Sequence, residues 1–135
     1  MVNCAKTSTR EKNGKLVHAD PFKVFLLNKA QDLHGFQVVL SSSWRHSKTW
    51  REDMKAQGFV FEFLDRTPIE RGPHMTCRGD EIQAWLDAHP EVTRYAILDD
   101  DDDMLKVQIT NFFKTTWEEG LLEETMDRVI AHLNQ

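Results

Sequence analysis

The chain has 135 residues, of which 40% are hydrophobic and 29% charged, and its formal net charge is −5. This composition is that of a domain with a buried core, and it argues against a membrane-spanning segment, a secretory signal peptide and a basic protein that coats duplex nucleic acid. The two cysteines, Cys4 and Cys77, have no metal-ligand spacing and no disulfide pattern, so we expect a cytoplasmic protein.

The charge is unevenly distributed along the chain. Residues 1–40 carry 6 Lys and Arg against 3 Asp and Glu, and residues 41–78 carry 7 against 5. Residues 79–135 carry only 4 Lys and Arg against 14 Asp and Glu. This pattern fits a site that pairs cationic side chains with an acidic metal-binding loop, and it equally fits an ordinary solvated surface.

The first half of the chain alternates turn signals with apolar segments. Asn13-Gly14 predicts an exposed β-hairpin over residues 7–18. Asp20 and Pro21 are suited to the start of a helix, and Gly35 is suited to its end. The next expected elements are a buried strand over 36–40, a helix over 47–57 and a short strand over 59–64.

The second half continues the alternation after a loop over residues 65–78. The expected elements are a helix over 80–89, a strand over 94–98, a strand over 109–115 and a helix over 121–133. Helices that alternate with short apolar strands predict an α/β fold, in which a parallel sheet has helices on both faces. We expect residues 1–135 to form a single domain.

Five consecutive carboxylates, Asp99–Asp103, directly follow the apolar segment Tyr95–Leu98. They are therefore expected at the carboxyl end of a buried strand, which is the edge where open α/β sheets bind ligands. Hard carboxylate oxygens suit Mg²⁺ or Ca²⁺, although a solvated acidic loop is the alternative. An EF-hand loop starting at Asp99 is excluded, because Met104 and Thr110 occupy its required Gly and Glu positions.

Two further segments carry polar groups to the junction of a strand or loop with a helix. Ser41, Ser42 and Ser43 follow the strand over 36–40, where hydroxyl and N–H groups would either cradle a phosphate or cap the next helix. Arg78 precedes the helix over 80–89, although a cation is unfavourable at a helix N-terminus. Arg78 would therefore neutralise an anion, or would simply be exposed to solvent.

Taken together, these segments resemble the haloacid-dehalogenase-like (HAD) superfamily of phosphohydrolases. The resemblance is carried by VVLSSSWR, RGDEIQAWL and YAILDDDDD, with supporting segments on either side, and covers most of residues 16–134. The chain looks most like the small HAD domain associated with Swiss army knife RNA repair proteins. The resemblance implies a Rossmann-like parallel sheet and a Mg²⁺-dependent phosphatase activity in RNA repair.

The resemblance also implies roles for individual residues. Ser41 would bind the transferring phosphoryl group, with Ser42 beside it, and Arg78 would stabilise developing negative charge. Asp100 would bind Mg²⁺ with Asp99 and Asp103 as supporting carboxylates. Arg45 would contact the rest of a phosphorylated substrate.

One part of the family pattern has no counterpart in the sequence. The superfamily's first central strand ends in D-x-D, which supplies the nucleophile and the general acid, whereas Glu11 is the only carboxylate before His18. Four explanations are open: the chain starts inside a longer reading frame, it is a truncated pseudoenzyme, a partner chain or dimer supplies the strand, or the N-terminal segment fills the gap. With this Asp pair absent, Mg²⁺ binding should be weak and in the millimolar range.

The sequence therefore supports two functional hypotheses, beside a third and plainer interpretation as a helix-flanked α/β interaction module with an acidic loop. In the first, the full-length protein is a phosphohydrolase that acts on a nucleotide or a nucleic-acid end. In the second, the chain is a catalytically inactive HAD-like remnant that binds a phosphate ligand or a protein. Turnover of phosphoesters distinguishes the two hypotheses.

Overall fold

The computed structural model describes residues 19–116 and 118–135. The β-hairpin predicted over residues 7–18 lies outside this described part of the chain. None of the described helices is long and apolar enough to cross a membrane.

The first helix, α2 (Pro21–His34), begins and ends where the sequence predicts. The Asp20 carboxylate accepts a hydrogen bond from the Phe22 N–H at 2.9 Å, and Gly35 ends the helix in the left-handed conformation, with φ of 69°. The helix buries the face that contains Val24 and Leu27. Three large apolar side chains of this helix are exposed instead, namely Phe22, Phe25 and Leu33.

The strand β1 (Val39–Leu40) pairs in parallel with β2 (Asp65–Arg66). Between them lie the short 3₁₀ helix η1 (Ser43–His46) and the helix α3 (Trp50–Ala56). Strand β1 is shorter than the predicted strand over 36–40, because the ladder of backbone pairing extends only over the two residues that face β2.

The strand predicted over residues 59–64 is wrong. Its last residue bonds to the backbone beside β1, with the Leu64 N–H donating to the Val38 carbonyl at 2.9 Å, but the ladder does not extend back over the segment. Side chains bind its backbone instead, with the Val60 N–H donating to Asn28 and the Arg51 guanidinium donating to the Phe63 carbonyl. The alternate aromatic residues Phe59 and Phe63 are buried in the core and pack edge to face. Alternating apolar residues thus reflect core packing here rather than a β-ladder.

The second half contains α4 (Arg78–Asp87), β3 (Ile97–Asp99), η2 (Lys106–Asn111), β4 (Phe112–Lys114) and α5 (Glu123–Leu133). Strands β3 and β4 are parallel. The predicted helices over 80–89 and 121–133 are therefore confirmed within a few residues. The predicted strands over 94–98 and 109–115 are each shorter in the structure, and a 3₁₀ helix takes up the beginning of the second.

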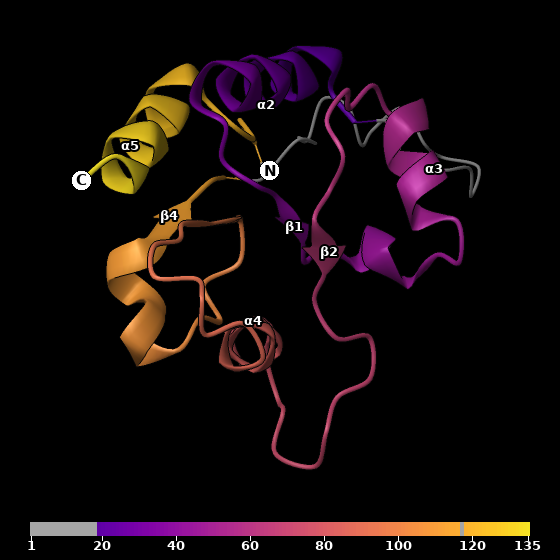
Figure 1. Ribbon diagram of the computed structural model, residues 1–135, viewed down its shortest axis with the longest axis vertical. Helices are drawn as coiled ribbons and strands as arrows, with labels where there is room; N and C mark the ends of the chain where they lie inside the picture. The colour runs from indigo at the N-terminus through magenta and orange to yellow at the C-terminus, as the bar shows by residue number, and fades with distance from the viewer. Residues whose placement is uncertain (1–18, 117) are drawn as a thin grey trace.

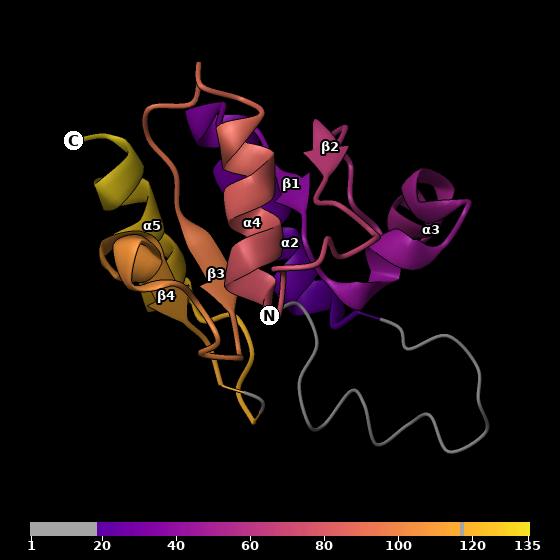
Figure 2. The same cartoon turned by 90° about the horizontal axis from the view of Figure 1, so that it is seen from below.

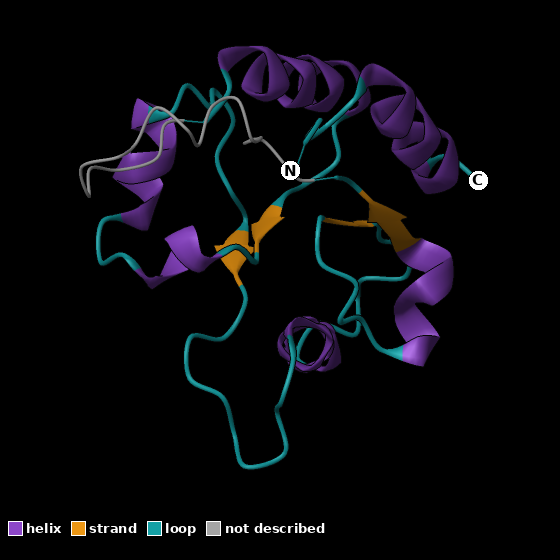
Figure 3. Cartoon of the chain, turned by 180° about the vertical axis from the view of Figure 1, so that it is seen from behind, coloured by secondary structure: helices purple, strands orange, loops and turns teal. Residues whose placement is uncertain are grey.

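The strands form two separate pairs rather than one continuous sheet within the described residues. Figure 1 shows α2 and α5 side by side above the strands and α4 below them, and the view in Figure 2 places α4 between β3 and β1. Figure 3 shows the two strand pairs from behind, with a gap between their ribbons. The main core joins the buried faces of α2, α3 and α5, and includes Leu27, Met54, Leu121 and Val129.

Candidate functional site

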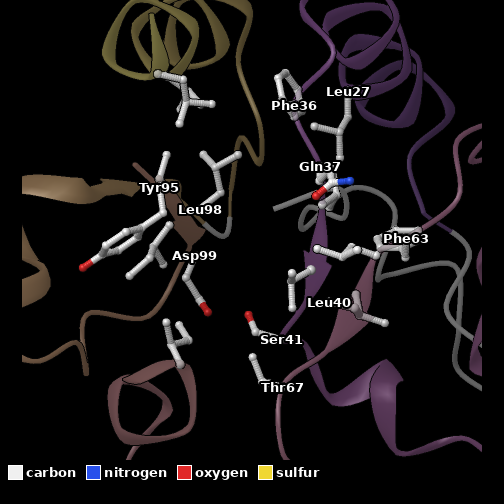
Figure 4. A pocket seen from close by; sticks show the side chains of 18 of the residues that line it. Leu27, Phe36, Gln37, Leu40, Ser41, Phe63, Thr67, Tyr95, Leu98 and Asp99 are labelled. Atoms are coloured by element: carbon white, nitrogen blue, oxygen red, sulfur yellow. The ribbon is translucent and has the colours of Figure 1, made fainter. Parts of the chain in front are cut away.

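The inner strands β1 and β3 run in the same direction and end at the same level. Figure 4 shows Ser41 after β1 and Asp99 at the end of β3, with their side chains pointing toward one another across the gap. Thr67, which follows β2, lies beside Ser41 in the same view. The carboxyl ends of these strands thus bring together polar side chains, and in open α/β sheets ligands bind at this edge.

Arg78, in the first turn of α4, joins the two strand pairs. Its Nη1 donates a short hydrogen bond to the Ser41 carbonyl and lies 3.5 Å from Asp99 Oδ2. The Arg78 side chain is 22% exposed, so part of the guanidinium faces solvent. We call the group Ser41, Thr67, Arg78 and Asp99 the mouth. It places one partly accessible cation between a hydroxyl-bearing loop and a carboxylate.

The acidic loop fixes the start of α4 and so fixes Arg78. The Asp103 carboxylate accepts from the Arg78 N–H at 3.0 Å, and the Asp103 carbonyl accepts from the Gly79 N–H at 3.2 Å. A carboxylate at this helix end is electrostatically favourable and offsets the unfavourable Arg78 charge. A Cβ on Gly79 would lie 2.6 Å from the Leu105 nitrogen, so only glycine allows this close approach.

Gln108 also fixes the contact between the acidic loop and the start of α4. Its side chain is fully buried, donates to the Gly79 carbonyl at 2.9 Å and accepts from the Leu105 N–H at 2.9 Å. The buried amide thus fixes the acidic loop against α4. The sequence gives no sign of this role, because a lone glutamine before a predicted strand has no distinctive pattern.

The carboxylates predicted to bind metal have different environments. The Asp99 side chain is buried, and this burial raises the pKa of its carboxyl group, although the Asp101 N–H and the Arg78 charge act in the opposite direction. Asp100 is exposed, and Asp103 is engaged with α4. The part of the chain that the structure describes contains no cluster of three or more His, Cys, Asp or Glu side chains placed to hold a metal.

Arg45, predicted to contact the substrate, is instead buried in the protein. Its side chain is 3% exposed and forms a short ion pair with the equally buried Glu81 of α4. Its remaining N–H groups donate to the carbonyls of Ser41, Ser42 and Pro68, at 2.8 to 3.3 Å. Because these donors are already occupied by protein acceptors, Arg45 fixes the segment Ser41–Ser43, which we call the serine loop, and has no free face for a ligand.

Two buried hydroxyl groups near the mouth have no hydrogen-bond partner among the described residues. They are Ser42 Oγ and Thr67 Oγ1. Unpaired buried hydroxyls are costly, so groups of this kind next to a cation are candidate ligand contacts. Sequence reasoning identified Ser42 and missed Thr67, because residues 65–78 were expected to form a loop without a strand.

The chain was compared with models of known families. The family described as the HAD domain in Swiss Army Knife RNA repair proteins matches residues 2–126. The matched range includes Ser41, Arg78 and Asp99. Searches of curated proteins and of solved structures gave no match.

Proposed function

Because the chain belongs to the family of HAD domains in Swiss Army Knife RNA repair proteins, we propose that its mouth binds the phosphoryl group of a nucleotide or a nucleic-acid end for hydrolysis. The observation that supports this most directly is the position of Arg78 between Ser41 and Asp99. A partly exposed guanidinium presents several N–H donors to phosphate oxygens. The Ser41 hydroxyl and the Thr67 hydroxyl, which lie beside each other in Figure 4, supply further donors.

The carboxylates of β3 and the following loop fit Mg²⁺ by their chemistry. Mg²⁺ commonly binds one or two carboxylates and keeps several waters, and Asp99 and Asp100 offer two carboxylates at a strand end. A bound cation would supply electrostatic stabilisation of phosphoryl oxygens. Asp103 is proposed only as a supporting group, because its carboxylate already accepts from the Arg78 N–H. We expect Mg²⁺ to bind with millimolar affinity.

Hydrolysis at the mouth would also need a nucleophile. In the superfamily it is the first Asp of a D-x-D motif at the end of a central strand, and the described residues have no strand between β1 and β3. The proposal therefore assigns Ser41, Thr67 and Arg78 to binding and charge stabilisation. Hydrolysis requires a carboxylate that enters the mouth from elsewhere.

The same observation favours a second candidate function, a phosphate-binding module without turnover. In this alternative the mouth retains its cation and hydroxyls and binds a phosphorylated ligand without cleaving it. Retained binding groups still accelerate a reaction modestly, so a weak residual rate would not by itself establish an enzyme.

One set of measurements tests both candidates. Calorimetry with orthophosphate and Mg²⁺ should give binding that weakens about tenfold or more in Arg78→Gln, because a charge-assisted contact is lost. Arg128→Gln, which changes an exposed arginine of α5, serves as the control with unchanged binding. Failure of orthophosphate to bind would contradict both candidates.

Turnover is measured separately with 5′- and 3′-phosphorylated RNA oligonucleotides, by release of inorganic phosphate. Release by the full chain at rates that Arg78→Gln abolishes would support hydrolysis. Binding without release would favour the module. Equal release by wild type and Arg78→Gln would show that the activity comes from another site.

A further inference from the structure

Two arginines contact the same indole ring on the α3 side of β2. The guanidinium carbon of Arg51 lies 4.4 Å from the centre of the Trp50 ring, and that of Arg66 lies 5.7 Å from it. Trp50 is buried, whereas both arginines are half-buried and so reach the surface. We call Arg51 and Arg66 the outer arginines. A guanidinium held over an aromatic ring keeps its N–H groups for hydrogen-bond acceptors around its edge.

Backbone carbonyls orient both guanidinium groups. Arg51 donates from Nη1 and Nη2 to the carbonyls of Phe63 and Leu64, at 2.5 and 3.4 Å. Arg66 donates from Nη1 alone, to two carbonyls at the end of η1, at 2.7 and 3.4 Å. Because a guanidinium has five N–H donors, each outer arginine retains N–H groups that no acceptor in the described part of the chain uses.

The charges of the outer arginines are not neutralised by a carboxylate. Neither arginine forms an ion pair among the residues that the structure describes. The carboxylates of the neighbouring elements contact other groups, namely Asp53 with Thr49, Glu62 with Lys55 and Asp65 with Trp85. Glu52, which follows Arg51 in the chain, is exposed to solvent. Two like charges around one indole repel each other, and uncharged carbonyls orient them without cancelling them, so this surface favours an anion.

The outer arginines and the mouth lie on opposite faces of β2. Asp65 donates no proton but accepts from Trp85 of α4, so its carboxylate faces α4. Because side chains alternate along a strand, Arg66 points to the other face, where it contacts η1, and Thr67 returns to the α4 face. Figure 1 shows α3 on the side of β2 away from β4. One phosphate bound at the mouth therefore does not reach the outer arginines, and a ligand that contacts both needs further phosphates.

We propose that the outer arginines bind backbone phosphates of a nucleic-acid strand whose terminal phosphate occupies the mouth. This rests on the proposed function and narrows its substrate from a nucleotide to a polynucleotide. The exposed Lys48, between η1 and α3, adds a third cation to the same surface. Trp50 is 8% exposed, so a base does not stack on it, and the contacts are with phosphates alone. The strand is therefore bound without regard to its sequence.

The length dependence of RNA binding tests this proposal. Calorimetry on the full chain compares a mononucleotide, a trinucleotide and a hexanucleotide, each with a terminal phosphate at the 5′ or the 3′ end. Affinity should rise about tenfold or more from the mononucleotide to the hexanucleotide, because charge-assisted contacts are added. The double variant Arg51→Gln with Arg66→Gln should lose this gain, since glutamine keeps amide donors but no charge. Arg128→Gln is the control variant and should keep the gain.

Salt titration measures the number of phosphate contacts. The slope of log affinity against log salt concentration changes by about 0.7 for each phosphate contact on a single strand, so hexanucleotide binding should have a slope about 1.4 smaller in the double variant. Urea unfolding verifies that the double variant is folded. Hydrogen exchange on the wild-type chain needs no variant: the hexanucleotide should slow exchange over residues 46–52, and orthophosphate should not.

Orthophosphate binding and a hexanucleotide without a terminal phosphate separate this proposal from the proposed function. The double variant should bind orthophosphate as wild type does, because its changes lie outside the mouth. The unphosphorylated hexanucleotide should bind equally to wild type and Arg78→Gln, and about tenfold more weakly to the double variant. Failure of orthophosphate to bind would contradict the proposed function alone.

Three results would overturn the assignment of the outer arginines. They are equal affinity for the mononucleotide and the hexanucleotide, a length dependence that the folded double variant retains, and binding of a hexaglutamate peptide as tight as that of the hexanucleotide. The last result would assign the outer arginines to acidic protein segments instead of nucleic acid. Equal binding of hexanucleotides of different sequence would support contacts with the backbone.

Discussion

Two arginines contact the same carbonyl group and have opposite environments. Arg45 and Arg78 both donate to the Ser41 carbonyl, one from the 3₁₀ helix η1 and the other from the start of α4. Arg45 is 3% exposed and paired with Glu81, whereas Arg78 is 22% exposed and lies 3.5 Å from Asp99. The donors of Arg45 are all used by protein acceptors. The Arg78–Asp99 contact is longer, and Arg78 retains donors for a ligand.

This difference distinguishes Arg45, which holds the site together, from Arg78, which is proposed to contact the ligand. The Arg45–Glu81 pair ties α4 to the serine loop, and the same helix carries Arg78. The buried pair thus sets the position of the accessible cation. Substitutions in the first pair should therefore affect stability most, and substitutions in the second should affect ligand binding most.

The largest effect is expected from Arg45→Met. Among the described residues, this change leaves buried Glu81 with the Arg71 ion pair alone, at 3.4 Å and from a side chain that is 47% exposed. Removing one partner of a buried ion pair costs about 3 kcal/mol of unfolding free energy. Urea denaturation measures this loss. The double variant Arg45→Met with Glu81→Leu should lose less than the single variant, since no uncompensated charge remains, and a larger loss in the double variant would contradict this explanation.

Gly79→Ala should have the next largest effect. The added Cβ would lie 2.6 Å from the Leu105 nitrogen and 2.9 Å from Gln108 Oε1, so the acidic loop or α4 must move. We expect a loss of about 2 kcal/mol in unfolding free energy, together with weaker orthophosphate binding because Arg78 is displaced. The matched control is Gly72→Ala, whose Cβ meets only Met75 Sδ at 3.6 Å. Equal losses in the two variants would contradict the packing argument.

Arg78→Lys tests whether Arg78, unlike Arg45, affects ligand binding more than stability. In Arg78 a single atom, Nη1, contacts both Ser41 and Asp99. A lysine retains the positive charge but loses the planar guanidinium, whose other N–H groups can form paired hydrogen bonds with phosphate oxygens. Orthophosphate affinity should fall severalfold, while the unfolding free energy should change by less than about 1 kcal/mol because the side chain is partly exposed. Calorimetry and urea denaturation of the same preparation test this separation. A large loss of stability with unchanged affinity would assign Arg78 a structural role.

The sequence predicted those features that depend on neighbouring residues. Asp20, Pro21 and Gly35 placed both ends of α2, because capping and left-handed glycine are local effects. The step from an apolar strand into carboxylates likewise placed Asp99 at a strand end. The family resemblance added the expectation that Ser41, Arg78 and Asp99 belong to one site, and the structure brings these three residues together.

Features that depend on distant partners could not be predicted. The family resemblance implied that Arg45 contacts the ligand, and local sequence could not reveal its ion pair with Glu81, which lies 36 residues further along the chain. The alternating residues of Phe59–Phe63 indicated a strand, but whether a strand forms depends on a neighbouring edge that local sequence does not specify. Thr67 was missed for the same reason, since β2 forms only where Asp65 and Arg66 meet β1.

The smallest effect, and the one most specific to the mouth, is expected from Asp99→Asn. Burial raises the pKa of Asp99 in the folded state above its unfolded value, which is about 3.9. The protonated carboxyl therefore favours folding: its contribution to stability is fully present below about pH 4 and is lost as the pH rises through the folded-state pKa. Asparagine imitates the protonated form and keeps an oxygen to accept from the Asp101 N–H.

Asp99→Asn should therefore be more stable than wild type at pH 7, and the two proteins should become equally stable below about pH 4. Urea denaturation at pH 3.5, 5 and 7 measures the difference. The same variant should bind Mg²⁺ more weakly, because a neutral amide replaces a carboxylate ligand. A gain in stability together with a loss of Mg²⁺ binding would mean that the buried charge is retained for the ligand. A variant less stable than wild type at pH 7 would instead mean that the Arg78–Asp99 contact outweighs the cost of burial, and the mouth would then resemble the Arg45–Glu81 pair.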